Sequence, residues 1–192
     1  EALLERARAY RRTGNEAAAA ADLERGVAEI DRLRSTLAEW QFRTQVGEFI
    51  QAFGDELFTL HLAANRFDEA FAAAERLRAR EVTRRSAAAS TAPPSLGSLA
   101  AALPADTAMV WYFTLDGETV AWGIGGGSAS IARIPAGRAE IARLVDRDPL
   151  KDRASAESLG SLLLKPFAAL LERTSTLVIV PDGPIHLVPF AA

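Results

Sequence analysis

The sequence contains no cysteine, and this absence narrows the chemistry that its own residues can perform. Without a thiol, the chain can form no disulfide, no thiolate metal site and no cysteine nucleophile. Histidine is also scarce, with only His61 and His186 present. A zinc site wants three or four clustered ligands at characteristic spacing, and the sequence shows none. We therefore expect no metal and no cofactor.

Long hydrophobic runs are missing as well. No apolar run reaches the roughly 18 residues that a membrane-spanning helix needs, and the charged opening EALLERARAYRR is unlike a secretion signal. The net charge of −3 offers no general attraction to nucleic acid or to anionic lipid. These features predict a cytoplasmic globular protein with no nucleic-acid and no membrane partner. The chain opens on Glu1, which is not a natural start, and it ends in the apolar run HLVPFAA just after a buried-type strand. A central strand needs neighbours on both edges, so we expect the chain to be the N-terminal portion of a longer protein.

Proline is absent from residues 1–86, and the pattern there predicts helix almost throughout. Alanine is abundant, and apolar residues recur at helical spacing. These are Leu23, Val27, Ile30, Leu33 and Leu37. Helix breaks are predicted around Gly14, which suits a C-terminal cap and precedes the N-capping residue Asn15, and at 64–66. Gly54 is either a third break or a close packing point.

Small, aromatic and turn residues in this helical half follow the spacing of a tetratricopeptide helix-turn-helix unit. The residues at that spacing are Ala7, Tyr10, Gly14, Ala19, Leu23 and Gly26. A weaker copy covers 58–77, with Asn65 at its turn and packing positions at Ala70, Ala74 and Leu77. Ala19 and Ala70 are 51 residues apart, against a usual period of about 34. We therefore expect an irregular array with a longer helix over about 40–64; a generic alanine-rich bundle is the alternative.

The helical pattern ends in the stretch SAAASTAPPSLGSL, at 86–99. Its small residues and the pair Pro93-Pro94 are incompatible with a continuing helix. The sequence therefore predicts three regions: helical repeats over 1–86, a linker over 87–99 and a second domain over 100–192.

After the linker the apolar pattern changes to that of strands. The predicted strands are TAMVWYFTL (107–115), ETVAWGIG (118–125), SASIARIP (128–135) and STLVIVP (175–181). Asp116-Gly117 is a hairpin turn signal between the first two. The first strand is apolar on both faces, which predicts a sheet covered on both sides. One face carries Val110 and Tyr112, and the other carries Met109, Trp111 and Phe113.

Helical patterns separate the third strand from the fourth. They cover 138–146 and 156–173, with Pro166 expected to open a new helix. A helix followed by the short, buried-type strand 175–181 implies an α/β sandwich. The expected fold class is therefore α+β overall: all-α helical hairpins, then an incomplete α/β sandwich.

Two stretches resemble ligand sites without meeting their requirements. A phosphate-binding loop leads directly into a helix, whereas GIGGGS (123–128) leads into a predicted strand and no GK[ST] follows. We expect a turn between strands there. The arginines of 75–85 alternate with Glu75 and Glu81, at spacings that pair opposite charges on one helix face. We expect a solvated helix surface there, and not a nucleic-acid contact.

Both histidines have structural explanations. His61 falls where the repeat usually packs an aromatic side chain, so we expect it at a helix interface. His186 follows Asp182 in VIVPDGPIHLVPF (178–190), and the sequence leaves a Ser-His-Asp arrangement open because such groups converge only in space. The PDG turn alone explains the aspartate, which can bond the backbone across the turn while Gly183 takes a positive φ. We therefore predict a strand-turn-strand segment with a structural role.

The run LVIVPDGPIHLVPFAA (177–192) closely resembles the signature of the CHAT domain, a caspase-like domain found downstream of tetratricopeptide repeats. The similarity extends upstream. AFAAAERLRAREV (70–82) resembles the end of the preceding helical region, and LPADTAMVWYFTLDGETVAWGI (103–124) resembles the opening hairpin. SLLLKPFAALLERTSTLVIVPDG (161–183) resembles the helix and strand before the signature. The similarity covers about 58–192.

The resemblance implies a bacterial cysteine endopeptidase of caspase and separase type. In that family the dyad is a histidine, usually in an HG motif, and a later cysteine near a strand end. Both lie downstream of the signature, so no residue of this sequence matches either one, and His186 is not the family's catalytic histidine. We expect no catalytic residue in this chain. The signature residues are expected to be structural: Pro181, Asp182, Gly183, His186, Pro189 and Phe190.

Three functions follow as hypotheses. In the first, the helical repeats recruit a protein partner for a protease, and the rest of the CHAT domain or a second copy covers the sheet edges. In the second, the chain belongs to a non-catalytic scaffold with a degenerate CHAT module. The third is a nucleotide-binding α/β domain, which rests on GIGGGS alone.

Overall fold

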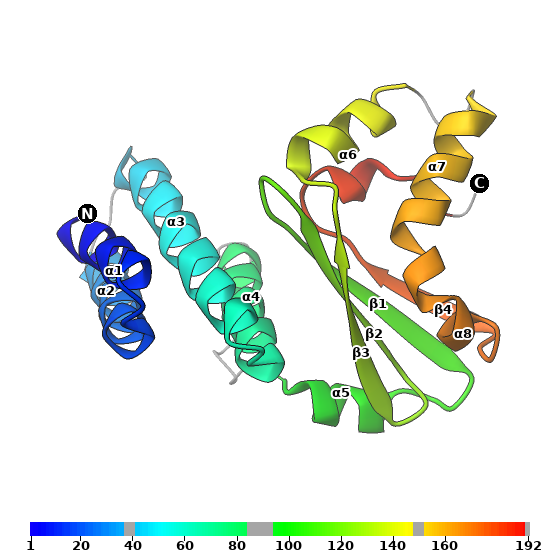
Figure 1. Ribbon diagram of the computed structural model, residues 1–192, viewed down its shortest axis with the longest axis horizontal. Coiled ribbons are helices and arrows are strands. Elements are labelled where there is room, and N and C mark those ends of the chain that lie inside the picture. Colours follow the sequence, from blue (N-terminus) through cyan, green and yellow to red (C-terminus); the bar gives the residue numbers. More distant parts are fainter. Residues whose placement is uncertain (37–40, 84–93, 148–151, 191–192) are drawn as a thin grey trace. The chain divides into compact units, whose positions relative to one another are not determined.

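The computed structural model describes residues 1–36, 41–83, 94–147 and 152–190. The chain divides into two compact units, Glu1–Ser95 and Leu96–Ala192. The first consists of helices, and the second contains a mixed sheet with helices (Figure 1). The predicted α+β class is confirmed.

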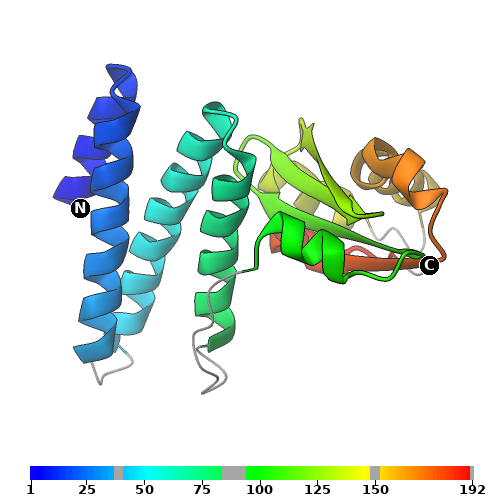
Figure 2. The ribbon, with the colours of Figure 1, turned by 90° about the horizontal axis from the view of Figure 1, so that it is seen from below.

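The helical unit is built from long helices (Figure 2). Its helices are α1 (Ala2–Arg12), α2 (Glu16–Thr36), α3 (Gln41–Ala63) and α4 (Phe67–Thr83). Turns of three residues fold α1 back on α2 and α3 back on α4, which gives two antiparallel hairpins. The predicted longer helix over about 40–64 is confirmed as α3.

Both predicted helix breaks are confirmed, and each has a left-handed residue. Gly14 has φ +75° and Asn65 has φ +54°. Glycine adopts this conformation without strain, and asparagine adopts it more readily than most residues. Asn15 then caps α2, because its Oδ1 accepts the backbone N–H of Ala18 at 3.2 Å. The residues at these turns therefore account for where α1 and α3 end and where α2 begins.

Small residues let the helices approach closely. A Cβ on Gly26 of α2 would lie 2.1 Å from the Phe53 ring of α3, and one on Gly54 of α3 would lie 2.3 Å from Leu77 of α4. Gly54 is therefore a packing point inside α3 and not a break. The first three helices share one apolar cluster with a residue of α4: Leu4, Ala7, Ala19, Leu23, Phe53, Leu57, Leu60 and Ala73.

Charged pairs complete the contacts of α1. Arg6 binds Asp22 of α2 through two hydrogen bonds of 2.5 and 2.6 Å. This guanidinium holds the pKa of Asp22 below its usual range. Arg8 binds Glu56 of α3 at 2.8 Å, and Arg11 binds the other oxygen of the same carboxylate. Helix α1 is thus tied to two neighbours by bidentate carboxylates.

The second unit opens with a helix, α5 (Leu96–Ala102), which buries Leu96 and Ala100 and packs against two strands of the sheet. The predicted linker ran to residue 99, so its last residues are helical; its part over 87–93 lies outside the described residues. Ser95 stands at a favourable N-terminal capping position, and the buried pair lies at i, i+4 on one helix face. The small residues and prolines of this stretch favoured a linker, so this short amphipathic helix was not predicted from the sequence.

The sheet has four described strands in the order β3-β2-β1-β4. They are β1 (Thr107–Thr114), β2 (Thr119–Gly125), β3 (Ser128–Ile134) and β4 (Thr176–Val180). Strands β1, β2 and β3 pair antiparallel, and β4 pairs with β1 in parallel. This arrangement confirms the predicted strands and the Asp116-Gly117 hairpin, in which the N–H of Leu115 donates to the carbonyl of Glu118 at 2.8 Å.

The GIGGGS stretch is the predicted turn. Gly126 and Gly127 have φ of +58° and +75°, and the flanking Gly125 and Ser128 pair with each other. Two residues with positive φ between paired strands form a type I′ hairpin turn, which follows the right-handed twist of the strands. The glycines are therefore required by backbone geometry.

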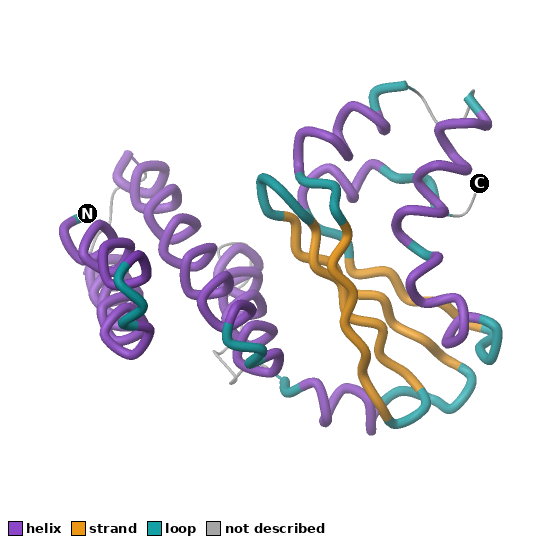
Figure 3. The backbone as a smooth tube through the Cα atoms, in the orientation of Figure 1, coloured by secondary structure: helices purple, strands orange, loops and turns teal. Residues whose placement is uncertain are grey.

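Helices cover one side of this sheet (Figure 3). They are α6 (Arg138–Val145), α7 (Arg153–Leu163) and α8 (Ala168–Leu171), the last preceded by the 3-10 turn η1 (Lys165–Phe167) that contains Pro166. Asp152 caps α7 by accepting the N–H of Ala154 at 3.2 Å. Val110 and Tyr112 of β1 pack with these helices, and the residues on the opposite face of β1 and β2 are also buried. The predicted two-sided burial is confirmed for these two strands.

Two expectations for the last segment are wrong. After β4 the chain forms a 3-10 helix, η2 (Gly183–Leu187), and not a second strand. Gly183 has φ +52° and Pro184 lacks an N–H for a strand ladder, so a helical turn is favoured. The sequence predicts a strand of the buried type at 175–181, yet Leu177 of β4 is 38% exposed. The cause is that β1 covers one edge of β4, whereas no described strand pairs with its other edge.

Candidate functional site at the carboxyl ends of β1 and β4

Strands β1 and β4 are parallel, so their carboxyl ends lie at the same edge of the sheet. Val180 pairs with Trp111, and β1 continues three residues beyond this pair to Thr114. In open α/β sheets, ligands and catalytic groups gather at the carboxyl ends of parallel strands. The segment 181–190 begins at this edge, which makes it the candidate functional site.

Asp182 joins the ends of the two strands. Its Oδ2 accepts the backbone N–H of Thr114 at 2.8 Å, and Thr114 Oγ1 donates to the backbone carbonyl of Asp182 at 3.3 Å. Thr114 is fully buried, and β4 has already ended at this level, so the carboxylate supplies a partner that a strand would otherwise provide. We expected Asp182 to bond the backbone across its own turn. It instead binds a residue 68 positions earlier.

Arg138, the first residue of α6, binds the same strand end. Its Nη2 donates to the carbonyl of Thr114, and its backbone N–H donates to the carbonyl of Leu115, both at 2.9 Å. A Cβ on Gly183 would lie 3.7 Å from Arg138 Nη1 and 3.7 Å from Thr114 Cβ. The end of β1 is therefore held by α6 on one side and by the start of η2 on the other.

Sequence reasoning missed Arg138, which it treated only as part of a helix. The available signal was the glycine before it. A Cβ on Gly137 would lie 1.9 Å from the carbonyl oxygen of Asp116, so only glycine lets α6 begin against the β1–β2 turn. A lone glycine at a helix start is too common for this contact to be inferred from sequence.

The apolar residues of the segment belong to the core. Ile185 is fully buried, and Val188 and Phe190 pack against the same cluster. The rings of Phe190 and Tyr112 are stacked, with centroids 6.4 Å apart and an angle of 22°. The Tyr112 hydroxyl donates to the carbonyl of Leu163 at 2.8 Å, and burial raises the pKa of Tyr112. The segment thus links β1 to α7 as well as to β4.

His186 lies apart from this network. Its side chain is exposed, as is that of Leu187, whereas Asp182 directs its carboxylate at the backbone of Thr114. No hydrogen bond joins Asp182 and His186 among the described residues, and these residues contain no group of three metal-ligating side chains. Pro181, Gly183 and Pro189 are half-buried. The described geometry is that of a brace between strand ends.

The other histidine lies in the helical unit. His61 of α3 is buried, with 8% of its surface exposed. Burial and then the charge of Arg66 lower the pKa of His61. Its Nδ1 has no hydrogen-bond partner among the described residues. The expected interior position is therefore observed.

The predicted packing residues lie where paired helices meet or turn. Ala7, Ala19 and Ala70 are buried, and Tyr10 is half-buried against the same cluster as Ala7. Gly14 is exposed in the first turn. These residues form helix–helix contacts and contribute no reactive group.

No protein-family model, no curated protein and no solved structure matches the chain significantly. Within the described parts of the chain, no helix is long and apolar enough to cross a membrane.

Proposed function

We propose that this chain is the tetratricopeptide-like region and the front part of a CHAT domain in a bacterial, cytoplasmic cysteine endopeptidase of caspase and separase type. The helical unit recruits a protein partner. The sheet unit supports a histidine and a cysteine that residues outside these 192 supply. The observation that carries the proposal is the position of the signature-like segment at the carboxyl ends of the parallel strands β1 and β4.

The contacts that hold these strand ends in place support the proposal. Catalysis by a thiolate requires a nucleophile and a base held within hydrogen-bond reach of each other. Such positions are held more precisely by strands and helices than by loops. Asp182 and Arg138 fix the end of β1, and the core residues Ile185 and Phe190 fix the chain after β4. A catalytic histidine and cysteine at this edge of the sheet would therefore be positioned by backbone that these contacts hold in place.

The exposed edge of β4 is evidence that a further strand pairs with the sheet. Among the described strands only β1 pairs with β4, and Leu177 and Leu187 are 38% and 69% exposed. An apolar strand with an open edge is a template for pairing with another strand. The rest of the CHAT domain covers this edge, or a second copy does so where that part is missing.

The helical unit supports partner recruitment. Glycine and alanine at its contacts bring successive helices close together, and three-residue turns keep each pair antiparallel. Stacked helical hairpins offer extended surfaces on which proteins bind. The stretch between α2 and α4 departs from a regular repeat because α3 has 23 residues. An irregular tetratricopeptide-like array is the proposed architecture.

The test uses the full-length gene product in its own cells. New protein N-termini are compared between cells with the wild-type protein and cells in which the cysteine downstream of Ala192 is changed to alanine. The proposal expects cleavage products that depend on this cysteine and disappear when the helical region 1–86 is deleted. A full-length protein without a downstream histidine and cysteine, or identical termini in both strains, would refute protease activity.

A non-catalytic scaffold is the second candidate. Asp182 acts as a structural acceptor and His186 is exposed, so the described signature-like segment carries no reactive pair, which a scaffold accounts for without any further residues. In this case the helical unit still binds a partner. Replacing the downstream cysteine would then leave both the partner and the cell unchanged, whereas deleting 1–86 would release the partner.

A further inference from the structure

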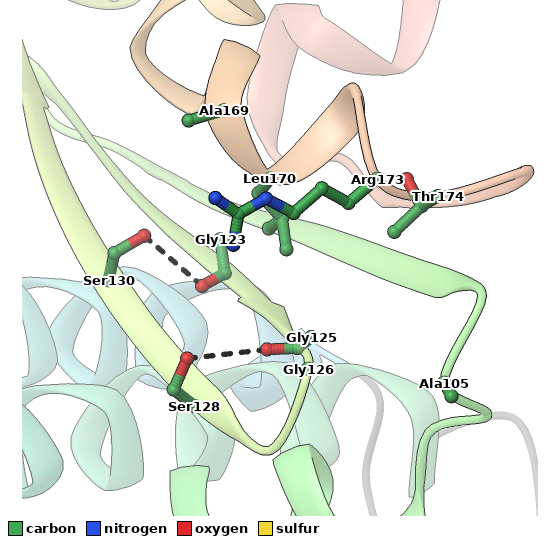
Figure 4. A pocket seen from close by; sticks show the side chains of 10 residues that line it. All are labelled: Ala105, Gly123, Gly125, Gly126, Ser128, Ser130, Ala169, Leu170, Arg173 and Thr174. Carbon is green, nitrogen blue, oxygen red and sulfur yellow. Dashed lines mark hydrogen bonds between the residues drawn. The ribbon is translucent and has the colours of Figure 1, made fainter.

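A pocket lies where strands β1 and β4 begin, which is the opposite end of these strands from Asp182. Figure 4 shows the residues that line it. It has a volume of about 350 Å³ and lies between the β2–β3 hairpin and the end of α8. Two of its residues, Ala105 and Thr174, come just before β1 and β4. Its lining also includes Gly123, Gly125, Ser128, Ser130, Leu170 and Arg173. We call this space the hairpin pocket.

The glycines of β2 explain why the pocket exists. A Cβ on Gly123 would lie 2.4 Å from the Phe167 ring, and one on Gly125 would lie 3.0 Å from Leu170. The η1–α8 segment therefore packs directly on the backbone of β2. It does not extend over the start of β3, where Ser128 and Ser130 are exposed. The result is a recess with one apolar wall and a floor of backbone and hydroxyl groups.

Arg173 supplies the charge of this recess. It is the one charged residue among the described residues that line it. Figure 4 shows its side chain extending from the end of α8 across Gly123 toward Ser130. No hydrogen bond or ion pair between described residues involves its guanidinium. The nearby carboxylate of Asp106 is outside the lining and accepts the hydroxyl of Ser175 at 2.8 Å.

The hydroxyls around Arg173 are weakly engaged. Ser128 Oγ and Ser130 Oγ donate to the carbonyls of Gly125 and Gly123 at 3.4 and 3.3 Å. Thr174 Oγ1 donates to its own helix end at 3.2 Å. Hydroxyl hydrogen bonds are usually about 2.7–2.8 Å long, so these three bonds are weak. Each hydroxyl can turn toward a stronger acceptor at little cost.

We propose that the hairpin pocket binds a small phosphomonoester. A guanidinium binds two oxygens of a phosphate in parallel, and hydroxyls on other sides meet the remaining oxygen of the tetrahedral group. A planar carboxylate, with two oxygens, satisfies fewer of these donors. The volume is at the lower end of the range for small-molecule sites. Leu170 and Ala169 provide an apolar surface for the body of the ligand.

This site differs from a nucleotide loop. GIGGGS forms a hairpin turn, so no helix N-terminus meets the phosphate. The charge comes instead from Arg173, 45 residues after the hairpin's Ser128. The pocket is also independent of the proposed protease, whose residues would lie at the other end of β1 and β4.

The test measures binding of phenyl phosphate, inorganic phosphate and benzoate to the chain by calorimetry. We expect phenyl phosphate to bind with a dissociation constant of about 1 mM or lower. It should bind more tightly than inorganic phosphate, which lacks the apolar body, and than benzoate, which lacks the tetrahedral group. Arg173→Gln should weaken phenyl phosphate binding about 10-fold or more. Arg153→Gln, which removes an exposed arginine on α7, should change it less than about twofold.

A second variant fills part of the hairpin pocket and leaves the charge of Arg173 in place. Ser130→Leu places a larger side chain in the pocket from the surface of β3 and should abolish binding while the melting temperature changes little. Equal effects of Arg173→Gln and Arg153→Gln would overturn the proposal, as would absence of phenyl phosphate binding at about 10 mM, well above the expected constant. Benzoate binding as tight as that of phenyl phosphate would overturn the assignment to a phosphate.

Discussion

The carboxylate of Asp182 accepts the backbone N–H of Thr114 at 2.8 Å, although the two residues are 68 positions apart. This bond continues the pairing of β1 with β4 past the last strand pair, with a side chain in place of a strand backbone. Thr114 is fully buried, so its N–H has no access to water. The relationship explains why an aspartate follows this strand without assigning it a reaction.

Asp182→Ala should destabilise the sheet unit by about 1–3 kcal/mol, because it leaves the buried N–H of Thr114 without an acceptor. Asp182→Asn retains a side-chain oxygen at the same place and should cost less. Urea denaturation followed by tryptophan fluorescence measures the difference, since β1 and β2 carry Trp111 and Trp122.

Thr114→Val separates the two bonds of this pair. It removes only the hydroxyl bond of 3.3 Å and leaves the backbone N–H in place, so it should destabilise less than Asp182→Ala. If Thr114→Val lowers the free energy of unfolding more than Asp182→Ala does, the carboxylate does not brace the strand ends. The same conclusion follows if Asp182→Ala is as stable as the wild type.

Gly137→Ala should destabilise the sheet unit by about 1–3 kcal/mol, as overpacking against a rigid neighbour does. The new Cβ would lie 1.9 Å from the carbonyl oxygen of Asp116, and a backbone atom cannot rotate away as a side chain can. Gly117→Ala is the matched control, because nothing lies within 4 Å of a Cβ there. Thermal denaturation of both variants should show a loss for position 137 alone; equal melting temperatures would contradict the tight contact between α6 and the hairpin.

Acidification should destabilise the helical unit through His61. Burial, followed by the charge of Arg66, lowers the pKa of His61 below its ordinary value of 6.5, and Arg76 acts in the same direction while Glu69 and Glu24 oppose it. Above about pH 6.5 both the folded and the unfolded chain carry neutral His61. As the pH falls through 6.5, the unfolded chain binds a proton that the folded chain resists, so the free energy of unfolding decreases.

Urea midpoints measured between pH 8 and pH 5 check this dependence, with His61→Leu as the reference. The leucine variant should lose the part of the decrease that begins near pH 6.5. Asp22, whose pKa is lowered by Arg6, contributes its own loss only at more acidic pH, below the ordinary value of 3.8. Parallel curves for the wild type and His61→Leu would show that His61 protonates equally in both states.

Local pattern was sufficient to predict much of this fold. Helical periodicity located α1 to α4, and the signals at Gly14, Asn65 and Gly126-Gly127 located turns, because each depends on residues close in sequence. The faces of β1 followed from simple alternation. The prediction for the end of the chain was wrong because it also relied on local composition. Pro-Ile-His-Leu-Val has the composition of a strand, but Gly183 and Pro184 favour the 3-10 helix η2.

The candidate sites could be predicted only in part. The motif drew attention to Asp182, yet its partner Thr114 lies in another strand, and no local pattern marks that pairing. Arg138 begins α6 and Arg173 comes just after α8, and neither has a local signal of its role; these roles appear only once α6 and α8 are placed on the sheet. Long-range contacts of this kind depend on topology, which a single sequence does not specify.

Strand β4 provides the last prediction, which concerns association. Its outer edge pairs with no described strand, and Leu177 is 38% exposed. An apolar, uncharged edge promotes pairing between chains, and a lysine on such an edge opposes it. Leu177→Lys should therefore reduce the concentration-dependent association of the 192-residue chain in sedimentation velocity. Ser161→Lys adds the same charge on the exposed surface of α7 and should leave association unchanged. Equal sedimentation of all three proteins would mean that the edge of β4 takes no part in association, and that the proposed cover for this strand is unnecessary.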